Sequence, residues 1–270
     1  MSELLMMFSY QFIVRAFVVG LLISLCASLL GVSLVLRGNA MISDGLSHVS
    51  FGAFAVATVL NIAPLTLAIP LAIVASIIIL QLDERHMIHG DGAIALLSSS
   101  ALAIGVMVIS ITKGVNTDIN NYLFGSILSL SNTDMIISIV LSIMVLILFF
   151  YSYHRIFALT FDQDFARSTG VKVDLYNMII AILCSVTIVL GMRMMGALLI
   201  SSLTIFPCLS SMRIARTFRL VVLWAAIIAV VCFIIGLSIS YLYATPTGAS
   251  IVIVHLVVFL ILSVVQMVKA

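Results

Sequence analysis

Long apolar runs, separated by short polar breaks, fill most of the chain. The runs are about twenty residues long, which is the length that an α-helix needs to cross a bilayer. Strands of a membrane barrel would instead alternate apolar and polar residues over about ten positions. Breaks at charges, Pro and Gly therefore predict nine membrane-spanning helices. They cover Phe12–Leu36, Met41–Leu60, Ala63–Leu80, Ala93–Ile111, Met135–Tyr151, Leu175–Gly191, Ala197–Met212, Leu220–Tyr243 and Ser250–Val268.

One apolar segment, Asn120–Ser131, is too short to span a membrane. We expect it to form an interfacial or partly buried helix, or to merge with a neighbouring span, so a count of eight spans also stays open. The prediction is thus an all-α polytopic membrane protein, with residues 1–270 forming a single transmembrane domain.

Composition supports a lipid environment. Of the 270 residues, 64% are hydrophobic and only 8% are charged, whereas a soluble domain carries roughly a quarter charged residues. The net charge of +2, without a basic run, gives no indication of nucleic-acid binding. The N-terminal residues lack the basic region and cleavage site of a signal peptide, so we expect the first apolar run to remain as a membrane helix.

The four cysteines lie singly in apolar runs, without a C-x-x-C pairing, and we interpret them as reduced packing residues. They are Cys26, Cys184, Cys208 and Cys232.

Positive residues between the predicted spans indicate orientation, because cytoplasmic loops are enriched in Lys and Arg. One set of helix ends carries nine of them: Arg37, Arg85, Arg155, Arg167, Lys172, Arg213, Arg216, Arg219 and Lys269. The opposite set carries three: Arg15, Lys113 and Arg193. We therefore expect the N-terminus outside and the C-terminus in the cytoplasm.

The longest polar insert is His154–Asp174, which this orientation places in the cytoplasm. Its charged residues surround two phenylalanines: Asp162, Asp164, Arg167 and Lys172 lie around Phe161 and Phe165. Such an amphipathic element suits docking of a soluble protein, and an ordinary solvated connector is the alternative.

Asp44 and His48 are the clearest candidates for chemistry. An ionisable residue inside a membrane span costs at least a few kcal/mol and is by default a functional candidate. The two residues are four apart, so on a helix they share one face. A carboxylate and an imidazole are common ligands of divalent transition metals. They make half a site, which two copies of the chain would complete.

Other interpretations of this pair stay open. Asp44 and His48 could form a buried hydrogen bond that holds neighbouring helices together, or a proton relay, since histidine titrates near neutral pH.

Further candidates are weaker. His255, alone in the last span, is more often a packed histidine than a ligand. Methionines 192, 194 and 195 could attract a soft metal but usually fill a core. The group Asp83, Glu84, His86, His89 and Asp91 fits a solvated connector better than a metal site.

There is no G-x-x-x-x-G-K-[ST] phosphate loop and no H-E-x-x-H, so the sequence supports neither ATP hydrolysis through that loop nor a hydrolase.

Several segments together resemble the permease subunit of the zinc/manganese/iron family of ABC importers, in the family's order and over nearly the whole chain. They are Arg37–His48, Gly90–Ala95, Tyr122–Leu128, Phe161–Gly170, Met195–Leu199 with Pro207, and Pro246–Ala249. The chain departs from the usual pattern at Ser98–Ser100 and at Pro207-Cys208, where other small or apolar residues are expected.

The resemblance implies roles for matching residues and a type II ABC importer permease fold. Asp44 and His48 fall on the family's intramembrane metal-coordinating pair. The segment containing Phe161, Asp162, Asp164, Phe165, Arg167 and Gly170 is similar to the region that couples to the ATPase. Ser47, Pro207, Pro246 and Gly248 become candidates for lining the path or for structural roles.

The resemblance also implies partners. Such permeases work as homodimers in the cell membrane, bind an ATPase dimer inside and receive metal from an extracytoplasmic binding protein. The permease itself is not an enzyme and holds no permanent cofactor. We therefore expect transport of a divalent metal, with zinc favoured, manganese next and iron as a further candidate. A proton-coupled secondary transporter and a membrane scaffold are the competing hypotheses.

Overall fold

Ten α-helices, and no strands, form the part of the chain that the computed structural model describes, residues 11–84, 90–112 and 131–269. They are α2 (Gln11–Leu36), α3 (Ile42–Val59), α4 (Pro64–Glu84), α5 (Gly90–Ile111), α7 (Asn132–Phe161), α8 (Gln163–Ser168), α9 (Val173–Met195), α10 (Ala197–Met212), α11 (Phe218–Tyr243) and α12 (Thr247–Lys269). The all-α fold class is therefore confirmed.

Seven of the described helices are long and apolar enough to cross a membrane: α2, α4, α5, α7, α9, α11 and α12. The prediction of eight to nine spans is slightly too high by this criterion. The two remaining predicted spans do form helices, but α10 has only 16 residues, and Asp44, His48 and several serines reduce the apolar character of α3. Of the predicted helix Asn120–Ser131, residues 120–130 lie outside the described part.

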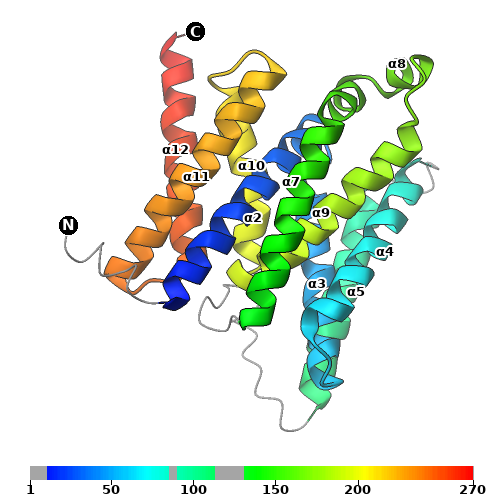
Figure 1. The fold of residues 1–270 in the computed structure, drawn as a ribbon, viewed down its shortest axis with the longest axis vertical. Helices are drawn as coiled ribbons and strands as arrows, with labels where there is room; N and C mark the ends of the chain where they lie inside the picture. Colours follow the sequence, from blue (N-terminus) through cyan, green and yellow to red (C-terminus); the bar gives the residue numbers. More distant parts are fainter. Residues whose placement is uncertain (1–10, 85–89, 113–130, 270) are drawn as a thin grey trace.

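The helices run alongside one another as one bundle (Figure 1). The start of α2 and the end of α12 lie at opposite ends of it. One end of the bundle holds the last turn of α2, helix α8 and the α10–α11 connection. The arginines that follow α2, that lie in α8 and that lie between α10 and α11 are therefore at this end. The α9–α10 junction, next to Arg193, lies toward the other end.

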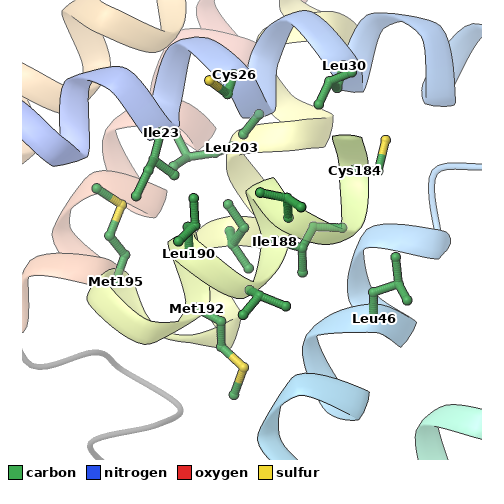
Figure 2. Packing of buried hydrophobic residues seen from close by; sticks show 14 of the residues in the cluster. Ile23, Cys26, Leu30, Leu46, Cys184, Ile188, Leu190, Met192, Met195 and Leu203 are labelled. Atoms are coloured by element: carbon green, nitrogen blue, oxygen red, sulfur yellow. The ribbon is translucent and has the colours of Figure 1, made fainter. Parts of the chain in front are cut away.

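Helices α2 and α9 form the centre of the bundle, since 72% of the apolar stretch of each helix is buried, against 11% of the apolar stretch of α12. Figure 2 shows Ile23 of α2 and Leu190 of α9 facing each other in this core, with Leu203 of α10 beside them. The mostly exposed apolar side chains of α5 and α12 are then suited to contact lipid or another protein.

Two glycines allow the central helices their arrangement. At Gly31 a Cβ would overlap the backbone of Thr204, so α2 and α10 approach more closely than larger residues permit. At Gly196 the backbone has φ +84°, a left-handed conformation that favours glycine, and it separates α9 from α10. Both glycines fix where α10 lies, and α10 carries part of the candidate site.

Candidate functional site

Asp44 and His48 lie on one face in the first turns of α3, as the spacing predicts. Nε2 of His48 is 3.7 Å from Oδ2 of Asp44, and the side chains keep 28% and 46% of their surface exposed, respectively. The separation is too long for a hydrogen bond. The pair is therefore not a tight buried hydrogen bond between helices, because both residues belong to α3 and face partly open space.

This geometry fits metal ligation with little movement. Two ligand atoms about 2.1 Å from one tetrahedral ion lie about 3.4 Å apart, close to the observed 3.7 Å. Nδ1 of His48 is buried and has no hydrogen-bond partner among the described residues. A partner for that nitrogen would ordinarily fix the ring, so this half of the site is not fully restrained.

Helix α10 supplies a hydroxyl that the sequence analysis missed. Ser201 donates a hydrogen bond to Oδ1 of Asp44 at 3.2 Å. One turn further along, Thr204 donates to the hydroxyl of Ser43 at 2.9 Å. Residues 157 positions apart meet here, and nothing local in the α10 sequence marks its serines as special. The first hydrogen bond holds the carboxylate of Asp44 beside α10, and the second joins the preceding residue of α3 to the same helix.

Ser47 lies between the two candidate ligands in sequence but is fully buried. Its hydroxyl donates to the backbone oxygen of Asp44 at 2.7 Å, as serines in membrane helices commonly do. Its predicted place on the path stays a prediction, and in the structure its visible contact is with its own helix.

One chain provides an incomplete metal site. Among the described residues, no group of three or more His, Cys, Asp or Glu side chains is placed to hold a metal ion. A zinc site usually has four ligands. Asp44 and His48 therefore need further ligands from a second chain, from water or from a delivering protein.

The other sequence candidates do not join this pair. His255 is fully buried in α12, with its ring stacked 6.5 Å from that of Phe206. Met192 and Met195 are buried members of the hydrophobic core, part of which Figure 2 draws. Of the polar group between α4 and α5, residues 85–89 lie outside the described part. The four cysteines are buried and free, as expected for packing residues.

Prolines and glycine at the remaining predicted positions are placed as follows. Pro207 is buried inside α10, where it cannot donate the usual helical hydrogen bond. Pro246 precedes α12, and Gly248 is buried in the first turn of that helix. The side chain of Asp44 contacts Ser201 and His48 rather than either proline in the described part of the chain, and the roles of Pro207, Pro246 and Gly248 on the path stay predictions.

The predicted coupling segment divides between three helices. His154–Phe161 continues α7, and Asp162 caps α8 by accepting a hydrogen bond from the backbone N–H of Phe165 at 2.9 Å. Leu159, Ala166 and Val173 form a small buried cluster beneath α8. With α8 held in this way, Phe161 and Phe165 each keep 62% of their surface exposed.

Charged residues surround these two rings. Asp164 lies in the first turn of α8 and is exposed. Arg167 pairs with Asp174 at 3.3 Å in the open, and Gly170, with φ +84°, turns the chain toward α9. A rigid helix end with two exposed aromatic rings and charged neighbours is typical of a protein-docking surface.

Comparison with known proteins places these features in a family. Residues 9–266 match the ABC 3 transport family. The chain is 31% identical over 252 residues to the high-affinity zinc uptake system membrane protein ZnuB of Haemophilus influenzae, covering 93% of this chain and 97% of that one. It is 30% identical over 252 residues to the manganese import system permease protein ScaB of Streptococcus gordonii, covering 93% and 90%.

A solved structure agrees. The fold is similar to a chain of PsaBC from Streptococcus pneumoniae in complex with Fab, with a TM-score of 0.85, 26% sequence identity and coverage of 97% of this chain and 94% of that one. The resemblance inferred from the sequence motifs is thus confirmed, and the chain belongs to the ABC 3 transport family of metal-transport permeases.

Proposed function

We propose that this chain is the transmembrane permease subunit of an ATP-driven divalent metal importer, in which Asp44 and His48 bind the metal briefly on its way across. The observation that carries the proposal is the pair itself: a carboxylate and an imidazole on one face of α3, within a bundle of apolar helices, 3.7 Å apart and partly exposed. Lipid would not tolerate such a pair without compensating interactions.

Two copies of the chain would complete the site. A homodimer with the pathway at the shared interface brings together two carboxylates and two imidazoles, a set that suits Zn²⁺ or Mn²⁺. The site must be selective enough to admit the ion and weak enough to release it. The exposure of Asp44 and the unpartnered Nδ1 of His48 fit a transient site better than a rigid structural one.

Energy would come from a separate ATPase that docks at α8. The exposed rings of Phe161 and Phe165 lie at the end of the bundle that also carries the described arginine-rich connections. By the positive-inside rule this end lies on the cytoplasmic side of the cell membrane. In this orientation the N-terminus is outside and the C-terminus is in the cytoplasm. An extracytoplasmic metal-binding protein would then deliver the ion at the opposite end.

Zinc is our first candidate and manganese the second. Carboxylate and imidazole ligands suit both ions, and affinity alone separates them poorly because protein sites discriminate by geometry. The two relatives described above, one named for zinc and one for manganese, are about equally similar to this chain.

Metal uptake by reconstituted permease and ATPase tests the proposal. Uptake of zinc and of manganese is measured with and without ATP, and with a protonophore, for the wild type and for Asp44→Ala and His48→Ala. We expect ATP-dependent uptake that resists the protonophore and falls at least tenfold in either variant. Uptake that the protonophore abolishes would indicate a proton-coupled carrier. Undiminished uptake by correctly folded variants would show that Asp44 and His48 do not bind the transported metal.

A further inference from the structure

A pocket lies where the α10–α11 connection meets the last turns of α12, with a volume of about 410 Å³. That volume falls within the range of small-ligand sites. Arg213, Arg216 and Gln266 provide its polar wall, and Ile214, Leu262 and Val265 are among its apolar residues. All of its lining residues are described, and none of them is acidic. The pocket is therefore both cationic and apolar.

The guanidinium of Arg213 is held in place. Its Nη1 donates to Oε1 of Gln266 at 3.1 Å, and its Cζ lies 5.5 Å from the ring centroid of Phe259. A guanidinium has five N–H donors, so one bond to Gln266 leaves others to bind an anion. Because the Arg213 side chain is already ordered, binding of an anion costs less free energy for ordering this side chain. Arg216, the second cation, is exposed at the same pocket.

The apolar side of the pocket continues along α12. This helix is the least buried of the seven candidate spans, with 11% of its apolar stretch buried. Leu260, Ile261 and Val264 each expose more than half of their surface. Acyl chains that lie against this face would lead to a head group in the pocket, because Val265 lines the pocket and also keeps 39% of its surface exposed on α12.

The pocket also lies at the membrane boundary. Helix α11 begins at Phe218 and α12 ends at Lys269, so both spans terminate beside it. In Figure 1 the α10–α11 connection and α8 are at the same end of the bundle but on opposite sides of the view. The ATPase-docking surface proposed above therefore does not include the pocket.

We propose that this pocket binds the phosphate head group of an anionic phospholipid, with the acyl chains along the exposed face of α12. Basic pockets between helices at a membrane surface are suited to acidic lipids. The lipid would link the α10–α11 connection to α12, and α10 is the helix whose Ser201 contacts Asp44. This inference does not depend on the identity of the transported metal.

Lipid retention measured by native mass spectrometry tests the proposal. The full-length chain, purified in mild detergent, receives an equal mixture of phosphatidylglycerol and phosphatidylcholine. We expect the wild type to retain phosphatidylglycerol preferentially. Arg216→Gln should reduce that preference about fivefold, equivalent to about 1 kcal/mol for one arginine near a membrane surface, and Arg213→Gln/Arg216→Gln should remove it.

Arg219→Gln is the matched control, because Arg219 is an exposed arginine close by in sequence that does not line the pocket. It should keep the wild-type preference. Equal retention of the two lipids by the wild type, an equal loss in the control, or full displacement of phosphatidylglycerol by millimolar inorganic phosphate would overturn the proposal. Unchanged lipid retention in Arg216→Gln with loss of ATPase binding would also overturn it and assign the pocket to the ATPase.

Discussion

Replacing Asp134 by Asn should leave Arg193 as an unpaired, largely buried charge. The Nη2 atom of Arg193 lies 3.6 Å from Oδ2 of Asp134, and the side chains keep only 20% and 17% of their surface exposed. At that separation the Coulomb attraction is about 4.6 kcal/mol for an effective dielectric constant of about 20. Partial exposure and the lack of a short hydrogen bond reduce the expected coupling to about 2 kcal/mol.

Thermal unfolding in detergent can measure this coupling. A thiol-reactive fluorescent dye reports unfolding, because the four cysteines are free and buried: Cys26, Cys184, Cys208 and Cys232. A loss of about 2 kcal/mol should lower Tm by roughly 4–8 °C in a chain of this size. The double variant Asp134→Asn/Arg193→Gln should be more stable than the sum of the two single losses predicts, because neither charge is then left alone.

The pair formed by Arg167 and Asp174 is the matched control. It has the same chemistry at 3.3 Å, but its side chains are 65% and 82% exposed. Asp174→Asn should therefore change the stability by less than about 0.5 kcal/mol. If Asp134→Asn behaves like this control, or if the double-variant losses simply add, the ion pair between α7 and α9 contributes nothing and the reasoning is wrong.

Three further predictions concern the packing and coupling of the helices. Gly31→Leu should destabilise the protein by more than about 3 kcal/mol, seen as a large loss of Tm, because the side chain would overlap the α10 backbone. Phe161→Ala with Phe165→Ala should abolish co-purification of the ATPase with only a small loss of Tm, since both rings are mostly exposed, although the Phe161 ring also contacts those of Phe157 and Phe218. Asn177→Leu should lower the stability by about 1.5–3 kcal/mol in the same dye assay, because it removes the 2.7 Å hydrogen bond from Arg37.

Each of these predictions has a control. Val18→Leu enlarges an exposed position on α2, where the side chain keeps 42% of its surface accessible, and should be tolerated. Tyr243→Ala removes an exposed aromatic ring at the end of α11 and should leave ATPase binding intact. Asn177→Asp keeps an acceptor for Arg37 and should retain the stability that Asn177→Leu loses. If a control variant lost more stability or ATPase binding than the variant it is compared with, the contact or docking role assigned to that position would be wrong.

The sequence predicts the helices well where apolar residues run without interruption. The predicted span Leu220–Tyr243 differs from α11 only at its start, Phe218. The predicted membrane span Met135–Tyr151 is shorter than α7, which runs from Asn132 to Phe161. His154 and Arg155 interrupt the apolar pattern there, although polar residues extend a helix readily once it leaves the membrane. A continuous apolar run indicates which part of a helix is suited to lie within the membrane, whereas the helix itself ends where its capping residues allow.

The candidate site is predictable only in part, for a physical reason. Asp44 and His48 are one helical turn apart, so their spacing alone places them on one face. The hydrogen bond from Ser201 depends on how α10 packs against α3, and the pairing of Asp134 with Arg193 depends on how α7 packs against α9. Such contacts between distant segments have no local pattern in a single sequence.

X-ray absorption at the zinc edge tests the central claim most directly, by reporting which atoms hold the metal in the permease–ATPase complex loaded with zinc. We predict nitrogen and oxygen ligands at about 2.0–2.2 Å, with an imidazole contribution that disappears in His48→Gln and a weaker oxygen contribution in Asp44→Asn. A shell of sulfur ligands at about 2.3 Å, or spectra that neither substitution changes, would contradict the assignment of Asp44 and His48 as the residues that bind the transported ion.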